Sequence, residues 1–266
     1  MICDAFQTEK YAKFWEDRGC RSELREGNLF LLKRKFGLTY AVCAYPSTEI
    51  GSSVLKDTFC EVRESRWKLP KSFVNNCSQS VKISLDGPNN VEKIWASLRK
   101  HNRNAIRQAE KRGTWFTESK TSCDEVFMNI YEQTASRKDF KMVKKQILVD
   151  YLDADFCKTY LVGVGEKTIG AYAVFEGEGV ARYYAGGFLY DFQQFRPNNF
   201  AHWNIILHYV NKGFSSYDMG RCGEESYHTW NFKTDFGKPI DSWSGHTRGW
   251  LLTKALSFYR NHSFYR

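Results

Sequence analysis

The sequence predicts an α/β (α+β) protein in which mixed, mostly antiparallel sheets are flanked by helices. Three strand-like runs, residues 159–164, 168–175 and 180–186, follow one another through short glycine-containing turns, which is typical of an antiparallel meander. Residues 91–112 and 200–211 carry apolar residues three or four apart, a spacing that predicts amphipathic helices. The 266 residues suffice for one large domain or two small ones with a buried core.

The composition is that of a globular protein. Hydrophobic residues make up 42% and charged residues 26% of the chain, and the apolar runs are far shorter than a membrane span. The net charge of +9 favours a polyanionic partner such as RNA or a nucleotide-linked substrate, or else serves only solubility. The aromatic content of 16% suits both a core and a nucleotide- or sugar-binding cleft.

Eight cysteines are scattered without C-x-x-C or histidine–cysteine ligand spacing, so we expect free thiols and no structural metal site. The N-terminal residues lack the apolar core of a signal peptide. We therefore expect a cytoplasmic protein with no transmembrane segment. The oligomeric state is open, with a monomer as the expectation.

The first part of the chain predicts four elements. Residues 8–18 predict a helix, and residues 29–35 and 39–45 a hairpin. Apolar residues from Ile50 to Val62 recur on one side of a helix, so residues 48–64 predict a second helix. Residues 72–85 contain a period-2 apolar run and predict a strand that ends at Asp86-Gly87-Pro88.

The helix predicted over residues 91–112 is strongly basic. Its basic residues recur three or four positions apart: Arg99, Lys100, Arg103, Arg107, Lys111 and Arg112. Like charges at this spacing destabilise a helix slightly, so an anionic partner such as phosphate explains their accumulation better than stability does. The alternative is a merely solvated face.

The remaining stretches continue the pattern of helices and strands. Residues 114–118 predict a strand, and residues 122–138 and 142–154 predict two helices before the meander. After the helix at 200–211 comes the stretch discussed next, then a short strand at 243–246 and a final helix at 248–260.

Residues 215–237 predict a strand, a loop with Asp218 and Gly220, and a helix from Glu224 to Phe236. Lys233 lies in this helix among three aromatic residues, Trp230, Phe232 and Phe236. An ammonium held among aromatic rings loses hydration, so it suits stabilisation of an oxyanion or chemistry at a lowered pKa. The alternative is a surface lysine whose stem packs along its aromatic neighbours.

Two separated segments resemble one known family. The first runs Ile94-Trp95-Ala96-Ser97-Leu98-Arg99 and then Ala105-Ile106-Arg107-Gln108-Ala109. The second comprises Tyr217-Asp218-Met219-Gly220, Phe232-Lys233 and Phe236-Gly237. In this order they resemble the Fem peptidyltransferases, which are similar to paired GNAT acyltransferase domains. Arg221 stands where that family has a second glycine, and residues 122–154 leave no room for the long coiled-coil arm of some members.

The resemblance implies two tandem GNAT-like lobes, residues 1–115 and 116–266, the second with the catalytic motif. It also implies transfer of an acyl or aminoacyl group to an amine, with aminoacyl-tRNA as donor and a nucleotide- or sugar-linked peptidoglycan precursor of the cell wall as acceptor. Phe232 and Lys233 fall on the pair associated with the donor carbonyl, Lys233 as the stabiliser of the oxyanion. Our substrate-binding candidates are Arg103, Arg107, Tyr184, Arg196, Asn198, Trp203, Asp218 and Arg221.

The donor is open between aminoacyl-tRNA and acyl-CoA, and no other cofactor is predicted. GNAT enzymes that use acyl-CoA hold its pyrophosphate on a glycine-rich turn at a helix N-terminus, but the corresponding Arg196-Pro197-Asn198-Asn199 has no glycine. Arg196 and the first free N–H groups of the helix can still bind one phosphate. The basic charge fits a tRNA donor.

Two further alternatives remain, a CoA-dependent N-acetyltransferase and a non-catalytic RNA- or nucleotide-binding protein of the same fold. The histidines show no metal-ligand spacing, and no nucleophilic serine motif or Walker loop occurs. Asp218 and Tyr184 are the candidate bases. Otherwise Asp218 caps its loop and Tyr184 packs on the sheet.

Overall fold

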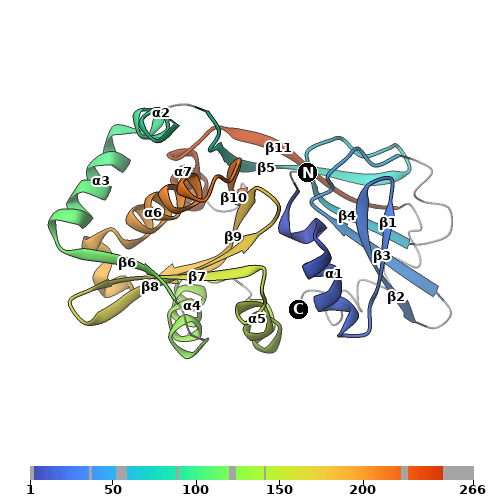
Figure 1. Ribbon diagram of the computed structural model, residues 1–266, viewed down its shortest axis with the longest axis horizontal. Coiled ribbons are helices and arrows are strands. Elements are labelled where there is room, and N and C mark those ends of the chain that lie inside the picture. Colours follow the sequence, from blue (N-terminus) through green and yellow to red (C-terminus); the bar gives the residue numbers. More distant parts are fainter. Residues whose placement is uncertain are drawn as a thin grey trace.

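The computed structural model describes residues 3–35, 38–51, 59–87, 90–119, 124–140, 142–222 and 227–247. In this part of the chain the strands form one 11-stranded sheet with the order β1-β2-β3-β4-β11-β5-β10-β9-β8-β7-β6 (Figure 1). The pairs β3–β4 and β9–β10 are parallel. The other neighbouring pairs are antiparallel. The predicted mixed, mostly antiparallel fold is therefore confirmed.

The N-terminal elements form one end of this sheet, with helix α1 packed against it (Figure 1). In chain order they are η1 (Ala5–Gln7), α1 (Glu9–Glu16), β1 (Arg21–Arg25), β2 (Asn28–Lys35), β3 (Leu38–Ala44), β4 (Phe59–Ser65) and β5 (Phe73–Ser84). Thr8 caps α1 by accepting a hydrogen bond from the backbone N–H of Tyr11. Tyr11 and Trp15 then lie one turn apart and are buried, which fixes the helix on the sheet.

The remaining elements form the other end, except for strand β11, which lies between β4 and β5. They are α2 (Asn90–Ser97), α3 (Lys100–Lys111), β6 (Thr114–Glu118), α4 (Asp124–Lys138), α5 (Lys145–Leu152), β7 (Cys157–Val164), β8 (Lys167–Glu176), β9 (Val180–Phe188), η3 (Tyr190–Phe195), α6 (Pro197–Asn211), β10 (Ser216–Cys222), α7 (Tyr227–Thr234) and β11 (Pro239–Thr247). Helices α2, α3, α6 and α7 lie on one face of the sheet, and α4 and α5 lie on the other (Figure 1).

Two large apolar cores fill the space between these layers. One joins α1, α4 and α5 to their side of the sheet, and the other joins α2, α3, α6 and α7 to theirs. In the second core Ile106 and Ala109 of α3 pack with Ile205 and Ile206 of α6. Helix α3 thus packs against the second half of the chain, while the lobe boundary at residue 115 stays a prediction.

Two predicted helices differ from the structure. The prediction for residues 48–64 is wrong at its end, because Phe59–Ser65 is strand β4. Cys60 and Val62 are buried in a third, smaller core. Their period-2 spacing is that of a strand, but the apolar residues from Ile50 to Val62 also fit the spacing of a helix. Residues 52–58 lie outside the described residues. The helix predicted over 91–112 is two helices, because Arg99 has an extended backbone.

Other differences concern the ends of elements. Strand β1 was not predicted, and β11 is longer than expected. Asp218 and Gly220 lie within β10 rather than in a loop. The final helix predicted at 248–260, like residues 223–226, lies outside the described residues. No helix in the described ranges combines the length and apolar character of a membrane span.

The N-terminal segment packs tightly against the turn between β8 and β9. The N–H of Cys3 donates to the carbonyl of Glu178 at 2.9 Å. A Cβ atom placed on Gly177 would lie 2.3 Å from the carbonyl oxygen of Cys3 and 2.4 Å from the nitrogen of Ala5. Only glycine, which has no Cβ atom, lets the N-terminal segment lie this close to residue 177.

Replacement of this glycine by alanine (Gly177→Ala) should therefore displace the N-terminal segment. We expect the free energy of unfolding to fall by about 1–3 kcal/mol, the usual cost of forcing an atom into a close-packed site. Urea unfolding followed by circular dichroism measures it. The control is Gly213→Asn, at a left-handed position with nothing within 4 Å, because asparagine tolerates that backbone. Equal losses in the two variants would contradict the tight approach.

Candidate active site

Strands β9 and β10 run parallel for only three paired positions before they separate. The pairs are Ser216 with Val180, Tyr217 with Ala181 and Asp218 with Arg182. Beyond them β9 follows β8 as far as Phe188, while β10 follows β5 as far as Cys222. We call the point after Arg182 and Asp218 the strand split. Diverging parallel strands expose backbone groups to a ligand.

A bulge in β10 lies at the strand split. Asp218 pairs with Lys82 and Arg221 with Ser80, so three steps on β10 match two steps on β5. Gly220 supplies the left-handed backbone, with φ of 75°, and its N–H donates to Oδ1 of Asp218 at 2.6 Å. Because the bulge adds one residue, Arg221 faces the same side of the sheet as Asp218.

Lys233 reaches the bulge from helix α7. Its side chain is buried, with 8% exposure, and Nζ donates to the carbonyl of Arg221 at 2.8 Å. The alternative of an exposed, snorkelling lysine is therefore wrong. The preceding Phe232 is half-buried, with its ring centre 5.4 Å from that of Phe236. The ammonium thus lies at an apolar wall beside the strand split.

His202 of α6 shares this apolar wall. Its Nδ1 lies 2.8 Å from the hydroxyl of Tyr217, and its ring centre lies 5.4 Å from that of Phe232. Burial, and then the charge of Lys233, lower the pKa of His202 to about 3. His202 is therefore neutral at pH 7, and the side of the strand split that holds Lys233 gains no second positive charge from it.

A buried arginine fixes the other side of the strand split. Nη2 of Arg182 lies 2.7 Å from Asp4 and 2.9 Å from Asp218, and the guanidinium carbon lies 3.4 Å from the ring centre of Tyr45. Burial alone would lower the pKa of Arg182, but Asp218 and Asp4 outweigh it and raise that pKa above its ordinary value. Both oxygens of Asp218 are engaged, which supports its reading as a cap rather than a base.

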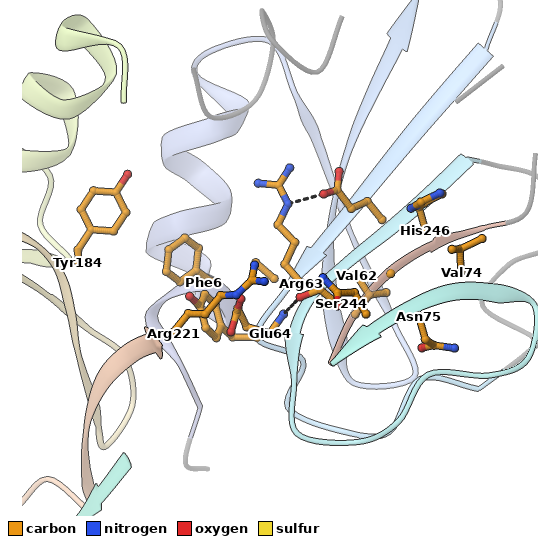
Figure 2. A pocket seen from close by; sticks show the side chains of 15 residues that line it. Phe6, Val62, Arg63, Glu64, Val74, Asn75, Tyr184, Arg221, Ser244 and His246 are labelled. Atoms are coloured by element: carbon orange, nitrogen blue, oxygen red, sulfur yellow. Dashed lines mark hydrogen bonds and ion pairs between the residues drawn. The ribbon is translucent and has the colours of Figure 1, made fainter. Parts of the chain in front are cut away.

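A pocket of about 520 Å³ opens next to the strand split, on the side of Arg221. We call it the junction pocket. It is lined by Phe6, Ala44, Tyr45, Glu61, Val62, Arg63, Glu64, Val74, Asn75, Asn76, Tyr184, Arg221, Ser244, Gly245 and His246. Tyr184 lies across the pocket from the strands that carry Arg63 and His246 (Figure 2). This volume lies within the usual range for a small-ligand site.

Tyr184 and Arg221 are the predicted substrate-binding residues that line this pocket. Tyr184 is half-buried and stacks on Phe175, with ring centres 4.1 Å apart, so its place in the pocket is fixed by packing on the sheet. The Arg221 side chain is exposed.

The predicted residues of the basic helix make contacts within the protein. Nη1 of Arg103 donates to the carbonyls of Ala96, at 3.1 Å, and of Leu98, which satisfies the end of α2. The Arg107 guanidinium lies over the ring of Trp95 at 5.3 Å. Neither lines the junction pocket, and their role in substrate binding stays a prediction.

The predicted residues at the start of α6 are also placed by internal contacts. Oδ1 of Asn198 accepts from the Tyr172 hydroxyl at 2.7 Å. Trp203 is buried against Trp95, with ring centres 4.8 Å apart. Arg196 is exposed and has a left-handed backbone with φ of 54°. Substrate binding by these three residues stays a prediction as well.

Three site residues were not anticipated: Arg182, Tyr45 and Glu64. Glu64 lies in the stretch predicted as a helix, where the alternation from Cys60 to Arg63 was the available signal. Nothing local marks Arg182 or Tyr45, because the residues that surround them come from distant parts of the chain.

The comparison with family models matches residues 96–233 to the family described as acetyltransferase (GNAT) domain. The chain belongs to this GNAT family. The matched range begins in α2 and ends at Lys233, so it contains the strand split, His202 and the bulge. No curated protein matches the chain.

Solved structures show the same fold at low sequence identity. FemX has a TM-score of 0.71 at 14% identity, covering 95% of this chain and 94% of its own. The C-terminal domain of a putative lysylphosphatidylglycerol synthetase from Agrobacterium fabrum has a TM-score of 0.62 at 12% identity, with coverages of 94% and 91%. L-PGS from Bacillus licheniformis has a TM-score of 0.56 at 10% identity, with 97% of both chains covered. The predicted Fem-like GNAT fold is thus confirmed.

The neutral state of His202 predicts a pH dependence of stability. The pKa of His202 is about 3 in the folded protein, below its ordinary value of 6.5. Between pH 3 and pH 6.5, His202 is therefore protonated in the unfolded chain and neutral in the folded protein. The stability of the folded protein is therefore unaffected by the titration of this histidine above pH 6.5, and it decreases as the pH falls from 6.5 towards 3. The slope of this decrease is about 1.4 kcal/mol per pH unit.

The measurement is urea unfolding of the wild type and of His202→Gln at pH 7, 6 and 5. We expect the variant to lose stability less steeply with acid than the wild type does. Parallel pH profiles would contradict a neutral, buried His202, whatever the absolute stability of the variant.

Proposed function

We propose that this protein transfers an acyl or aminoacyl group from an activated donor to an amine, with the reaction at the strand split. The observation that carries the proposal is the buried ammonium of Lys233, held 2.8 Å from the carbonyl of Arg221. In a chain of the GNAT family, this places a positive hydrogen-bond donor where parallel strands separate. Developing negative charge is stabilised most by such a preorganised donor in a water-poor site.

The chemistry needs little more than positioning. The acceptor nitrogen attacks the donor carbonyl carbon, a C–N bond forms, and the carbonyl oxygen becomes an oxyanion to which Lys233 donates. The bond to the leaving oxygen or sulfur then breaks, and the proton that the amine loses is balanced by the one the leaving group gains. Phe232 and Phe236 restrict water on the side of Lys233, which strengthens its electrostatic effect.

The donor that we favour is aminoacyl-tRNA, in a cytoplasmic reaction. The resemblance to Fem proteins and the net charge of +9 support it. The turn before α6 holds η3, a left-handed Arg196 and Pro197 rather than a glycine-rich turn. Lys100, Arg107 and Lys111 are exposed on α3 and are available to phosphates. The acceptor is proposed to bind in the junction pocket, as a nucleotide- or sugar-linked amine of the cell wall.

A CoA-dependent N-acetyltransferase is the second candidate. The family description, acetyltransferase (GNAT) domain, favours it. Helix α6 also offers its first backbone N–H groups, because Pro197 stands at its first turn and the first bond within the helix is that of Phe200 to Arg196.

Binding titrations with the two donors separate the two candidates. We expect bulk aminoacyl-tRNA to bind with an affinity that falls steeply as salt rises, because each phosphate contact releases counterions. Fluorescence anisotropy at 50 and 200 mM salt measures it, with Lys111→Ala as the variant expected to flatten the salt dependence. Tight CoA binding by calorimetry with no affinity for tRNA would instead support N-acetylation.

The role of Lys233 is tested by its replacement with methionine. Lys233→Met should lower the rate of acyl transfer about 10²–10³-fold, the usual effect of removing one oxyanion donor, with donor binding unchanged. Single-turnover transfer with radiolabelled aminoacyl-tRNA, or with acetyl-CoA if that donor binds, gives the rate. Lys212→Met is the matched control, because Lys212 is exposed and pairs with Glu176 away from the strand split. An active Lys233→Met protein would exclude the proposed mechanism.

A further inference from the structure

The junction pocket has a pair of charges that satisfy one another. Nε of Arg63 donates to Oε1 of Glu61 at 2.8 Å, and the hydroxyl of Tyr40 donates to the other carboxylate oxygen. Glu61 is buried, so this pair contributes no net charge to the pocket. The pocket's recognition of a ligand must come from other groups.

Two further charged residues in the wall, Glu64 and Arg221, are left with capacity to bind. Oε2 of Glu64 accepts from the Ser242 hydroxyl at 2.7 Å. Among the described residues no ion pair joins Glu64 or Arg221 to a charged side chain. Arg221 faces the pocket because of the bulge in β10. One carboxylate and one guanidinium, neither of which has an ion-pair partner in the described part of the chain, therefore line the same cavity (Figure 2).

The backbone at Glu64 is strained in a way that directs its side chain. Along β4, Glu61 and Arg63 line the pocket, while Cys60 and Val62 are buried in the third core, with Val62 also at the pocket wall. Strict alternation would point Glu64 into that core. Instead Glu64 has a left-handed backbone with φ of 53°, held by its N–H donating to the Ser244 hydroxyl at 3.0 Å. Such strain persists where surrounding contacts enforce it and is concentrated at functional sites.

Tyr45 shows that Glu64 lies close to the strand split. Tyr45 also has a left-handed backbone, with φ of 51°, which is rare for a bulky residue. Its N–H donates to the carbonyl of Arg63 at 2.8 Å, next to Glu64. Its ring covers the guanidinium of Arg182, the last β9 residue paired with β10. Glu64 therefore lies near Arg182 and Asp218, and so near the strand split at which the proposed reaction takes place.

We propose that the junction pocket selects acceptors in which the reacting amine is accompanied by an anionic group, a carboxylate or phosphate. Glu64 binds the amine and holds it at the strand split, and Arg221 binds the anion. Simple alkylamines, polyamines and neutral amino sugars lack the second charge and are poor acceptors. This assignment of substrate class rests on the proposed transferase function, and it concerns recognition rather than the chemical step.

A series of ω-amino acids measures the separation of the two charges. The probes are β-alanine, 4-aminobutyrate and 6-aminohexanoate, each compared by calorimetry with the n-alkylamine and the n-alkylcarboxylate of the same length. We expect one chain length to bind at least about tenfold more tightly than either single-charge analogue, a difference of about 1.4 kcal/mol. Equal affinity for the amino acid and its alkylamine at every length would overturn the proposal.

Two conservative variants assign the ends of the ligand. In Arg221→Gln the affinity for the amino acid should fall to that for the alkylamine of the same length. In Glu64→Gln it should fall to that for the alkylcarboxylate. Glutamine can still accept from Ser242, so the fold is kept, and thermal unfolding verifies this. The control Lys212→Gln should retain the preference. The assignment would be overturned if Lys212→Gln lost the preference for the amino acid, or if both Arg221→Gln and Glu64→Gln kept it.

Transfer assays with the same probes separate this inference from the function itself. Transfer that proceeds equally to amino acids and alkylamines would uphold the transferase and overturn the selection of zwitterions. Selective binding of amino acids with no transfer from any donor would uphold the pocket's specificity and overturn the transferase.

Discussion

The buried guanidinium of Arg182 is the contact on which the arrangement of the site depends. It joins the N-terminal segment through Asp4 and strand β10 through Asp218, while β9 carries it. Two carboxylates in the interior are tolerated only with a partner of opposite charge, so these three segments have one favourable arrangement. Because Arg182 and Asp218 are also the last pair of β9 and β10, the same contact sets where the strands begin to diverge.

The two sides of the strand split have different characters, and the β10 bulge connects them. Lys233 binds the Arg221 carbonyl from an apolar side where His202 is neutral. The Arg221 side chain lies on the other side, in a pocket of charged and aromatic residues. A regular strand would direct Arg221 towards the apolar core. The bulge, stabilised by Asp218 and Gly220, thus lets Arg221 act on both sides: its carbonyl accepts from Lys233, and its side chain lines the pocket.

The sequence was informative where a pattern is local. The meander of β7, β8 and β9 follows from strand-like runs that are joined by short glycine-containing turns. The aromatic neighbours of Lys233 pointed to a functional lysine but left its burial open, because they fit a surface lysine as well. Strand β4 was misread because its few apolar residues fit a helical spacing as well as an alternation. The cluster around Arg182 was not predictable, since residues 4, 45 and 218 meet it only in the folded chain.

Strand β11 lies between β4 and β5, although about 150 residues separate it from β5 and about 170 from β4 along the chain. During synthesis both strands are made long before their common neighbour, so each exposes an unpaired edge until residues 239–247 leave the ribosome. The sheet around the junction pocket can close only then. Nascent chains of this protein should therefore depend on protection from aggregation for most of their translation, and chains stalled ahead of β11 should be prone to pair with one another.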